Sequence, residues 1–140
     1  MITLEPIGFV RSSRSGLSDD DWGSVIARIE LVESLPAESL DGIEAFSHAE
    51  VERGARHPRG NTAWPKVGIF AQRGKGRPNR LRVTIVEVVR REGRTLTVTG
   101  LDAIDGTPVL DLKPVMAEFL PRTAVRQPEW SRELMRNYWG

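Results

Sequence analysis

The chain has 140 residues, of which 39% are hydrophobic and 28% charged, an ordinary composition for a soluble globular protein. It contains no cysteine, which excludes disulfides, a thiol nucleophile and thiolate metal sites, and with only two histidines we expect no metal centre. No apolar run approaches the roughly 20 residues of a membrane span, and the first residues lack the form of a signal peptide, so the expected location is the cytoplasm.

The length suits a single domain over residues 1–140, with residues 115–140 as a C-terminal extension. The net charge is only +1, yet 17 of the 20 basic residues are arginine. Five basic residues lie within ten positions: Arg73, Lys75, Arg77, Arg80 and Arg82. Because the guanidinium fork suits phosphate and carboxylate groups, this cluster indicates either an anionic partner or a solvated loop balanced by nearby acids.

The N-terminal part predicts two strands joined by a polar loop. Residues 2–10 read as the first strand, and residues 24–32 as the second, because apolar and polar positions alternate there. In the loop, three acids precede Trp22. This arrangement suits a cation or a stacked base, or else it is a solvated turn in which Trp22 covers the barrel edge.

The next part predicts helical turns over residues 35–46 and a strand over residues 46–52 that carries His48. A histidine can act as a base, a ligand or a buried hydrogen-bonding group, and a lone one on a strand is more often structural. A second histidine lies in the loop 54–61, and residues 66–72 read as another strand.

A β-hairpin is the strongest local prediction. Leu81, Val83 and Ile85 alternate with polar residues up to position 89, as in a strand with one buried face. Residues 91–94 follow as a turn in which Gly93 supplies a positive φ, and residues 95–99 form a β-branched return strand.

Two loops bracket this hairpin, and a short helix ends the chain. Residues 73–80 are rich in glycine and arginine, and residues 100–108 hold two carboxylates and two glycines before a strand at 109–112. Residues 115–120 are apolar and suit packing across an open end of the barrel or against a partner. Pro128 and Glu129 begin a predicted helix that runs to Trp139.

The pattern of six or seven short strands with little helix predicts an all-β sandwich or barrel. The segments GIFAQRGKGRPN and TGLDAIDGTPVLDLKP then add a specific signal, because they resemble the TrmO or YaeB-like family of S-adenosylmethionine-dependent tRNA methyltransferases. Residues 7–12, 41–48 and 57–58 agree as well. The resemblance implies a small, mostly antiparallel β-barrel that works as a homodimer with its cofactor near the subunit interface.

The resemblance also implies the site. Arg77 would anchor the cofactor, with Arg73 as the second choice, and His57, Asp102 or Asp105 would accept a proton. The implied cofactor-binding residues are Asp20, Asp21, Trp22, Arg56, His57, Pro58, Arg73, Arg77, Leu101, Asp102, Asp105, Gly106, Thr107 and Pro108. Without the resemblance, turn capping is the favoured explanation of the two aspartates of the second loop.

The implied reaction is methylation of the exocyclic nitrogen of threonylcarbamoyl-adenosine beside the tRNA anticodon. Candidate phosphate contacts are Arg80, Arg82, Arg132 and Arg136. Two alternatives stay open: a related methyltransferase acting on a small molecule, and a non-catalytic barrel that binds cofactor or RNA. The first fits the changed loop, where this chain has Gly74-Lys75-Gly76 in place of the family's Ser-Pro-Phe.

Overall fold

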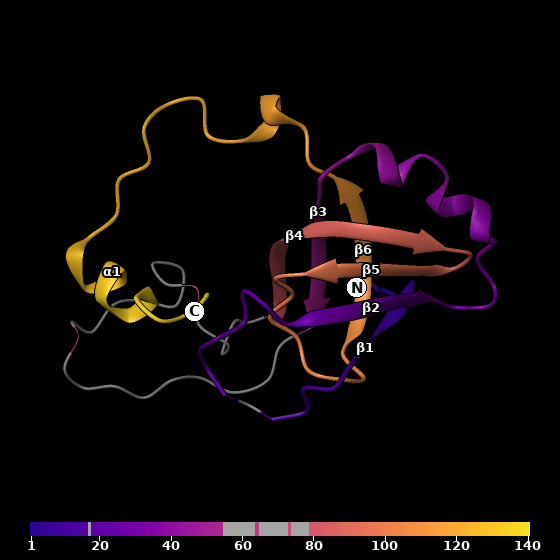
Figure 1. The fold of residues 1–140 in the computed structure, drawn as a ribbon, viewed down its shortest axis with the longest axis horizontal. Helices are drawn as coiled ribbons and strands as arrows, with labels where there is room; N and C mark the ends of the chain where they lie inside the picture. The colour runs from indigo at the N-terminus through magenta and orange to yellow at the C-terminus, as the bar shows by residue number, and fades with distance from the viewer. Residues whose placement is uncertain (17, 55–63, 65–72, 74–78) are drawn as a thin grey trace.

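A computed structural model of the chain describes residues 1–16, 18–54, 64, 73 and 79–140. Within these residues the fold is a closed antiparallel β-barrel with a short helix near the C-terminus (Figure 1). Its strands are β1 (Gly8–Ser12), β2 (Ile26–Leu31), β3 (His48–Gly54), β4 (Leu81–Glu92), β5 (Thr95–Thr99) and β6 (Pro108–Pro114). The all-β barrel prediction is therefore confirmed.

The strands follow one another around the barrel in the order β1-β2-β5-β4-β3-β6, and β6 closes it by pairing with β1. The predicted hairpin is the β4–β5 pair. The predicted strand at 66–72 lies outside the described residues. The first strand begins at Gly8 rather than at position 2, and Ile2 and Leu4 are exposed.

The barrel interior is filled by alternate residues of each strand. In β2 the inward residues are Ala27, Ile29 and Leu31, as the alternation predicts. Opposite them on β5, Leu96 and Val98 are fully buried. The remaining core side chains from the strands are Val10, Ala49, Val51, Val86 and Val109.

Strand β4 presents the opposite face from the one that the sequence indicates. Thr84 and Val86 point inward with 6% and 1% exposure, whereas Leu81, Val83 and Ile85 are 38–42% exposed on the outside. The prediction was wrong because apolar residues occupy both faces of this strand, so alternation alone does not decide which one is buried. The outer surface of β4 therefore carries an apolar stripe.

The hairpin turn is shorter than predicted, because β4 continues to Glu92 and only two residues join it to β5. Gly93 takes the first of these positions with a φ of 58°, a value that glycine adopts without steric cost.

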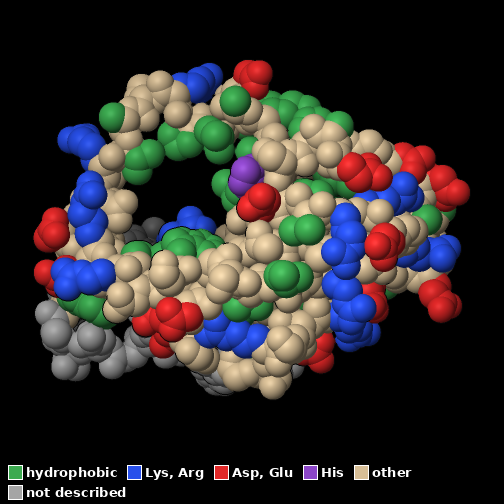
Figure 2. All heavy atoms as spheres, in the orientation of Figure 1, with side chains coloured by type: hydrophobic (Ala, Val, Ile, Leu, Met, Phe, Trp, Pro, Cys, Tyr) green, Lys and Arg blue, Asp and Glu red, His purple; other side chains and the backbone are tan. Residues whose placement is uncertain are grey.

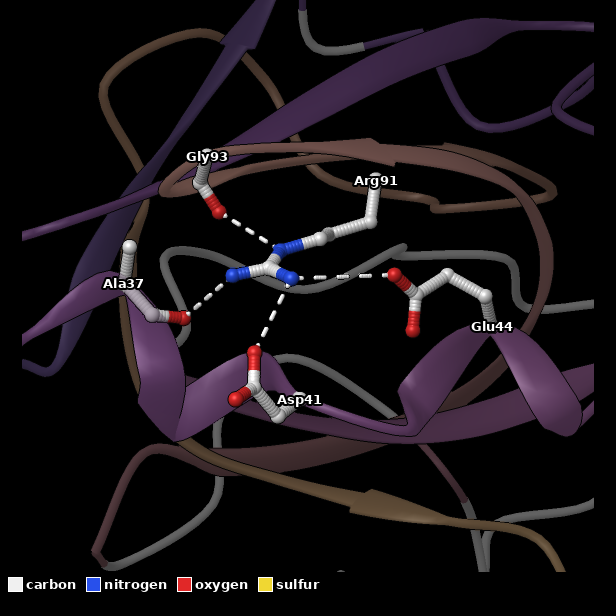
Figure 3. A network of polar contacts seen from close by, with 5 residues as sticks. All are labelled: Ala37, Asp41, Glu44, Arg91 and Gly93. Carbon is white, nitrogen blue, oxygen red and sulfur yellow. Dashed lines mark hydrogen bonds and ion pairs between the residues drawn. The ribbon is translucent and has the colours of Figure 1, made fainter.

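Arg91, near the end of β4, ties the hairpin to two 3₁₀ helices (Figure 3). These are η1 (Ala37–Leu40) and η2 (Ile43–Ala45), which confirm the helical turns predicted over residues 35–46. The guanidinium donates to the Ala37 carbonyl at 2.8 Å and to Asp41 at 3.0 Å, and it lies 3.7 Å from a Glu44 oxygen. Leu40 and Ile43 then extend the barrel core beneath the helices.

After β6 the chain leaves the barrel, arches outward and returns (Figure 1). This C-terminal arm, residues 115–128, includes the 3₁₀ helix η4 (Ala117–Phe119) and leads into α1 (Glu129–Met135), which confirms the predicted helix over a shorter range. Met116, Phe119 and Leu120 are exposed, so they do not cover the barrel end. None of the helices in the described part of the chain is long and apolar enough to span a membrane.

Candidate functional site

The loop between β5 and β6, residues 100–107, is fastened to the end of β1. The Gly106 N–H donates to the Val10 carbonyl at 2.9 Å, and the Val10 N–H donates to the Thr107 carbonyl at 3.0 Å. Gly106 has a φ of 78°, which glycine tolerates without steric cost. These bonds fix the loop at one end of the barrel.

The Asp105 side chain reaches the residues that follow β1. Its Oδ1 accepts the Ser12 N–H at 3.2 Å, and its own N–H donates to the Arg14 carbonyl at 3.0 Å. The residue remains exposed. Asp105 thus combines a turn-capping role with a carboxylate open to solvent.

Asp102, from the same loop, points in another direction. Its Oδ1 accepts the Thr84 hydroxyl of β4 at 2.5 Å, and its Oδ2 accepts the hydroxyl of Tyr138 near the C-terminus. The carboxylate is half-buried and has a donor on each oxygen. It joins the loop, the barrel wall and the end of the chain.

Arg14 organises the acidic loop that follows β1. Its guanidinium donates to the carbonyls of Ser18, Asp20 and Asp21 at 2.7–3.2 Å. It also lies 3.5 Å from the centroid of the Trp22 ring, in cation–π contact. Trp22 is 4% exposed, so in this structure it closes the barrel edge.

The last residues of the chain pair with this acidic loop. The N–H groups of residues 21–23 donate in turn to the carbonyls of residues 137–139 at 3.0–3.2 Å. A Cβ on Gly23 would lie 2.1 Å from the Trp139 carbonyl oxygen, so only glycine permits this approach. These last residues, 137–139, which we call the C-terminal tail, therefore form part of the candidate site.

The structure brings together several predicted cofactor-binding residues at this end of the barrel. Six of them lie on the two loops just described, one begins β6, and each keeps accessible surface: Asp20, Asp21, Asp102, Asp105, Gly106 and Thr107, with Pro108 at the start of β6. Leu101 is fully buried in the core, so only its backbone remains for a ligand. Arg73 is exposed and donates to the Val83 carbonyl of β4 at 3.2 Å. Arg56, His57, Pro58 and Arg77 lie outside the described residues.

The four predicted phosphate contacts come from two places. Arg80 directly precedes β4 and is exposed, and Arg82 is the second residue of β4 and is half-buried. Arg132 lies on α1 and Arg136 directly after it, and both are accessible to solvent.

Three residues of the site were not predicted from the sequence. Arg14 holds the acidic loop, Thr84 binds Asp102 from the barrel wall, and Tyr138 binds the same carboxylate from the tail. In the sequence, Tyr138 stands at helical spacing from Trp130 and Leu134, at i, i+4 and i+8. No pattern in the sequence marks its pairing with a loop 36 residues earlier.

The arrangement offers several carboxylates and two glycine-containing turns around one end of the barrel. Such a set suits a ligand that carries a cationic group and a heterocycle. Among the described residues, no group of three or more acidic or histidine side chains is placed to hold a metal ion.

Comparison with known proteins identifies the family. The family of tRNA-methyltransferase O N-terminal domains matches residues 20–119. The human protein named tRNA (adenine(37)-N6)-methyltransferase is 30% identical over 156 aligned positions, covering 97% of this chain and 35% of the human protein. A probable S-adenosyl-L-methionine-binding protein of Pyrococcus abyssi is 36% identical, covering 90% of this chain and 74% of that protein.

The fold agrees with a solved structure of the same family. The crystal structure of TrmO from P. aeruginosa superimposes with a TM-score of 0.79 and 26% sequence identity, covering 93% of this chain and 62% of that one. The chain thus spans about a third of the human relative and less than two thirds of the solved structure. The matched family and the shared barrel lead to one conclusion: this chain belongs to the TrmO family, through its tRNA-methyltransferase O N-terminal domain.

Proposed function

We propose that the chain is a methyltransferase that uses S-adenosylmethionine to methylate the exocyclic nitrogen of an adenosine beside the tRNA anticodon, in its threonylcarbamoyl-modified form. The names of the human and archaeal relatives support the reaction and the cofactor. The observation that carries the proposal is the position of the loop 100–107. This loop contains the LDAIDGT part of the family motif and lies against the acidic loop and the C-terminal tail.

The chemistry of the site fits this cofactor. S-adenosylmethionine carries a sulfonium and an ammonium group, which favour carboxylate neighbours, and a carboxylate, which favours a guanidinium. Asp20, Asp21 and Asp105 would face the cationic groups. The carboxylate of the cofactor would bind Arg77, the first choice from the sequence, or Arg73, the second choice. The adenine would lie against the loop 100–107, whose Gly106 and Thr107 N–H groups already donate to carbonyls of the chain.

The bound cofactor would supply a methyl group already activated by its sulfonium. The task of the chain is then to align the acceptor nitrogen, and good alignment can contribute about 7–11 kcal/mol. It must also provide a route for the proton that the nitrogen loses. Asp105 suits that step better than Asp102, because Asp102 accepts a hydroxyl on each oxygen whereas Asp105 is exposed.

We also propose that the chain works as a homodimer in the cytoplasm. The apolar stripe on β4 and the exposed apolar residues of the C-terminal arm support a dimer, since their burial by a second copy would remove both from water. Figure 2 shows hydrophobic side chains along the inner side of the arm, facing a hollow beside the barrel.

The test is transfer of a tritiated methyl group from S-adenosylmethionine to purified tRNA, followed by digestion to nucleosides. We expect label in N6-methylated threonylcarbamoyl-adenosine. Two acceptors are compared: tRNA that carries threonylcarbamoyl-adenosine without the N6-methyl group, and tRNA that lacks the threonylcarbamoyl group. Label found only in an adenosine without the threonylcarbamoyl group would show that the proposed acceptor is wrong. Cofactor binding without label in any tRNA would favour a small-molecule acceptor.

Two matched variants test the proton acceptor. Asp105→Asn removes the exposed carboxylate, and Asp102→Asn removes the one that is bound by two hydroxyl groups. We expect Asp105→Asn to lower kcat by about 10²–10⁴ at saturating cofactor. Unchanged kcat in a folded Asp105→Asn variant would contradict this role.

A further inference from the structure

A row of arginines crosses the outside of the barrel, away from the residues predicted to bind RNA. Arg11 of β1 lies opposite Arg28 of β2, Arg28 lies opposite Thr97 of β5, and Thr97 lies opposite Arg90 of β4. We call these three arginines the arginine row. Figure 2 shows basic side chains forming a band over these strands.

The arginine row does not exist to stabilise the barrel. Like charges directly opposite each other on neighbouring strands are destabilising, yet Arg11 and Arg28 are paired in this way. Arg11 turns to Glu30 at 3.2 Å, and Arg90 turns to Glu92 at 3.1 Å. Both ion pairs are exposed, so an incoming anion would displace them at little cost.

Arg28 differs from its two neighbours. It is exposed, and the structure gives it no hydrogen bond or ion pair with any described residue. The near acidic neighbour on its own strand, Glu30, is already bound to Arg11. Arg28 is therefore a cation at the centre of the row with its donors available.

The surface around Arg28 is concave. An open hollow of about 400 Å³ is lined by the arginine row together with Thr97, Ser13 and Asp105. Asp105 belongs to the loop that we propose for methyl transfer, so the hollow begins at the candidate site and extends across the strands. Neighbouring strands lie about 4.8 Å apart, which makes the row up to about 14 Å long.

We propose that the arginine row binds consecutive phosphate groups of an RNA backbone and guides the strand toward the loop 100–107. Guanidinium groups bind phosphate oxygens through two parallel hydrogen bonds, and a row of them suits a polyanion better than a single small anion. This inference rests on the proposed function, because it names the surface that presents the RNA substrate to that site.

The test is tRNA binding by Arg28→Ala at several salt concentrations, with Arg28→Lys as the conservative variant. Each lost phosphate contact lowers the slope of log affinity against log salt by roughly 0.7–0.9. We expect Arg28→Ala to weaken tRNA binding about tenfold and to lower this slope by about one, with Arg28→Lys restoring the slope but only part of the affinity. Arg126→Ala, on the C-terminal arm, loses the same charge and serves as control.

Binding of S-adenosylmethionine is measured on the same variants. Unchanged cofactor affinity with weakened tRNA binding supports the proposal. Equal loss of both would assign the row to the cofactor site, and unchanged tRNA binding and slope in Arg28→Ala would also overturn the proposal. Failure of the proposed function is separate, because it would appear as a wild-type protein that binds tRNA but transfers no methyl group.

Discussion

Replacing Gly23 by alanine tests whether the C-terminal tail forms part of the site. The added Cβ would lie 2.1 Å from the Trp139 carbonyl oxygen and 3.1 Å from its carbon. Both are backbone atoms, so no side-chain rotation relieves the clash and the tail must move. The hydrogen bonds from residues 21–23 to residues 137–139 would then break.

The size of the effect follows from those bonds. At about 0.5–1.5 kcal/mol for each backbone hydrogen bond, release of the tail costs about 2–4 kcal/mol. The bond from Tyr138 to Asp102 would be lost with them. We therefore expect the amides of residues 21–23 to exchange with solvent at least tenfold faster, and the affinity for S-adenosylmethionine to fall.

Hydrogen exchange measured by mass spectrometry reads this directly, and Gly16→Ala is the matched control. Gly16 lies in the same loop, and a Cβ there would meet nothing within 4 Å. Unchanged exchange in Gly23→Ala, or an equal change in Gly16→Ala, would refute the docking of the tail. Faster exchange with unchanged cofactor affinity would confine its role to structure.

Two further pairs of variants test the fold and the dimer. Arg91→Ala removes the hydrogen bonds to Ala37 and Asp41, so urea unfolding should show a free energy of unfolding lower by about 1.5–3 kcal/mol. Arg122 is exposed, and Arg122→Ala should change this free energy little. Equal stability of the two variants would contradict a stabilising role for the Arg91 network. Val86→Asp should prevent folding, because it buries an unpaired carboxylate inside the barrel. Ile85→Asp should fold and sediment as a monomer, because Ile85 lies on the outside. The reverse pattern would show that Ile85, and not Val86, points into the barrel.

The fold was predictable because most strands bury one face that the alternation identifies. Strand β2 is the clear case, since Ala27 and Ile29 are its buried residues and Arg28 is outside. For strand β4 the alternation predicted the wrong inner face, because Ile85 and Val86 are both apolar. Only its pairing with β3 and β5 decides which of them points inward.

The site was predictable only in part, for a related reason. The loop 100–107 carries its residues close together in the sequence, so its family motif marks it. The tail contact and the arginine row join residues far apart in the chain. Arg11, Arg28 and Arg90 become neighbours only through the register of the strands around the barrel, which local spacing does not reveal.

Calorimetric titration of the purified protein with S-adenosylmethionine tests the proposed function most directly, with S-adenosylhomocysteine as the comparison ligand. The proposal predicts one site per chain with micromolar affinity, which corresponds to about −8 kcal/mol. Absence of binding at millimolar ligand would contradict a cofactor site at the loop 100–107. The chain would then be a barrel of the TrmO family that does not use this methyl donor.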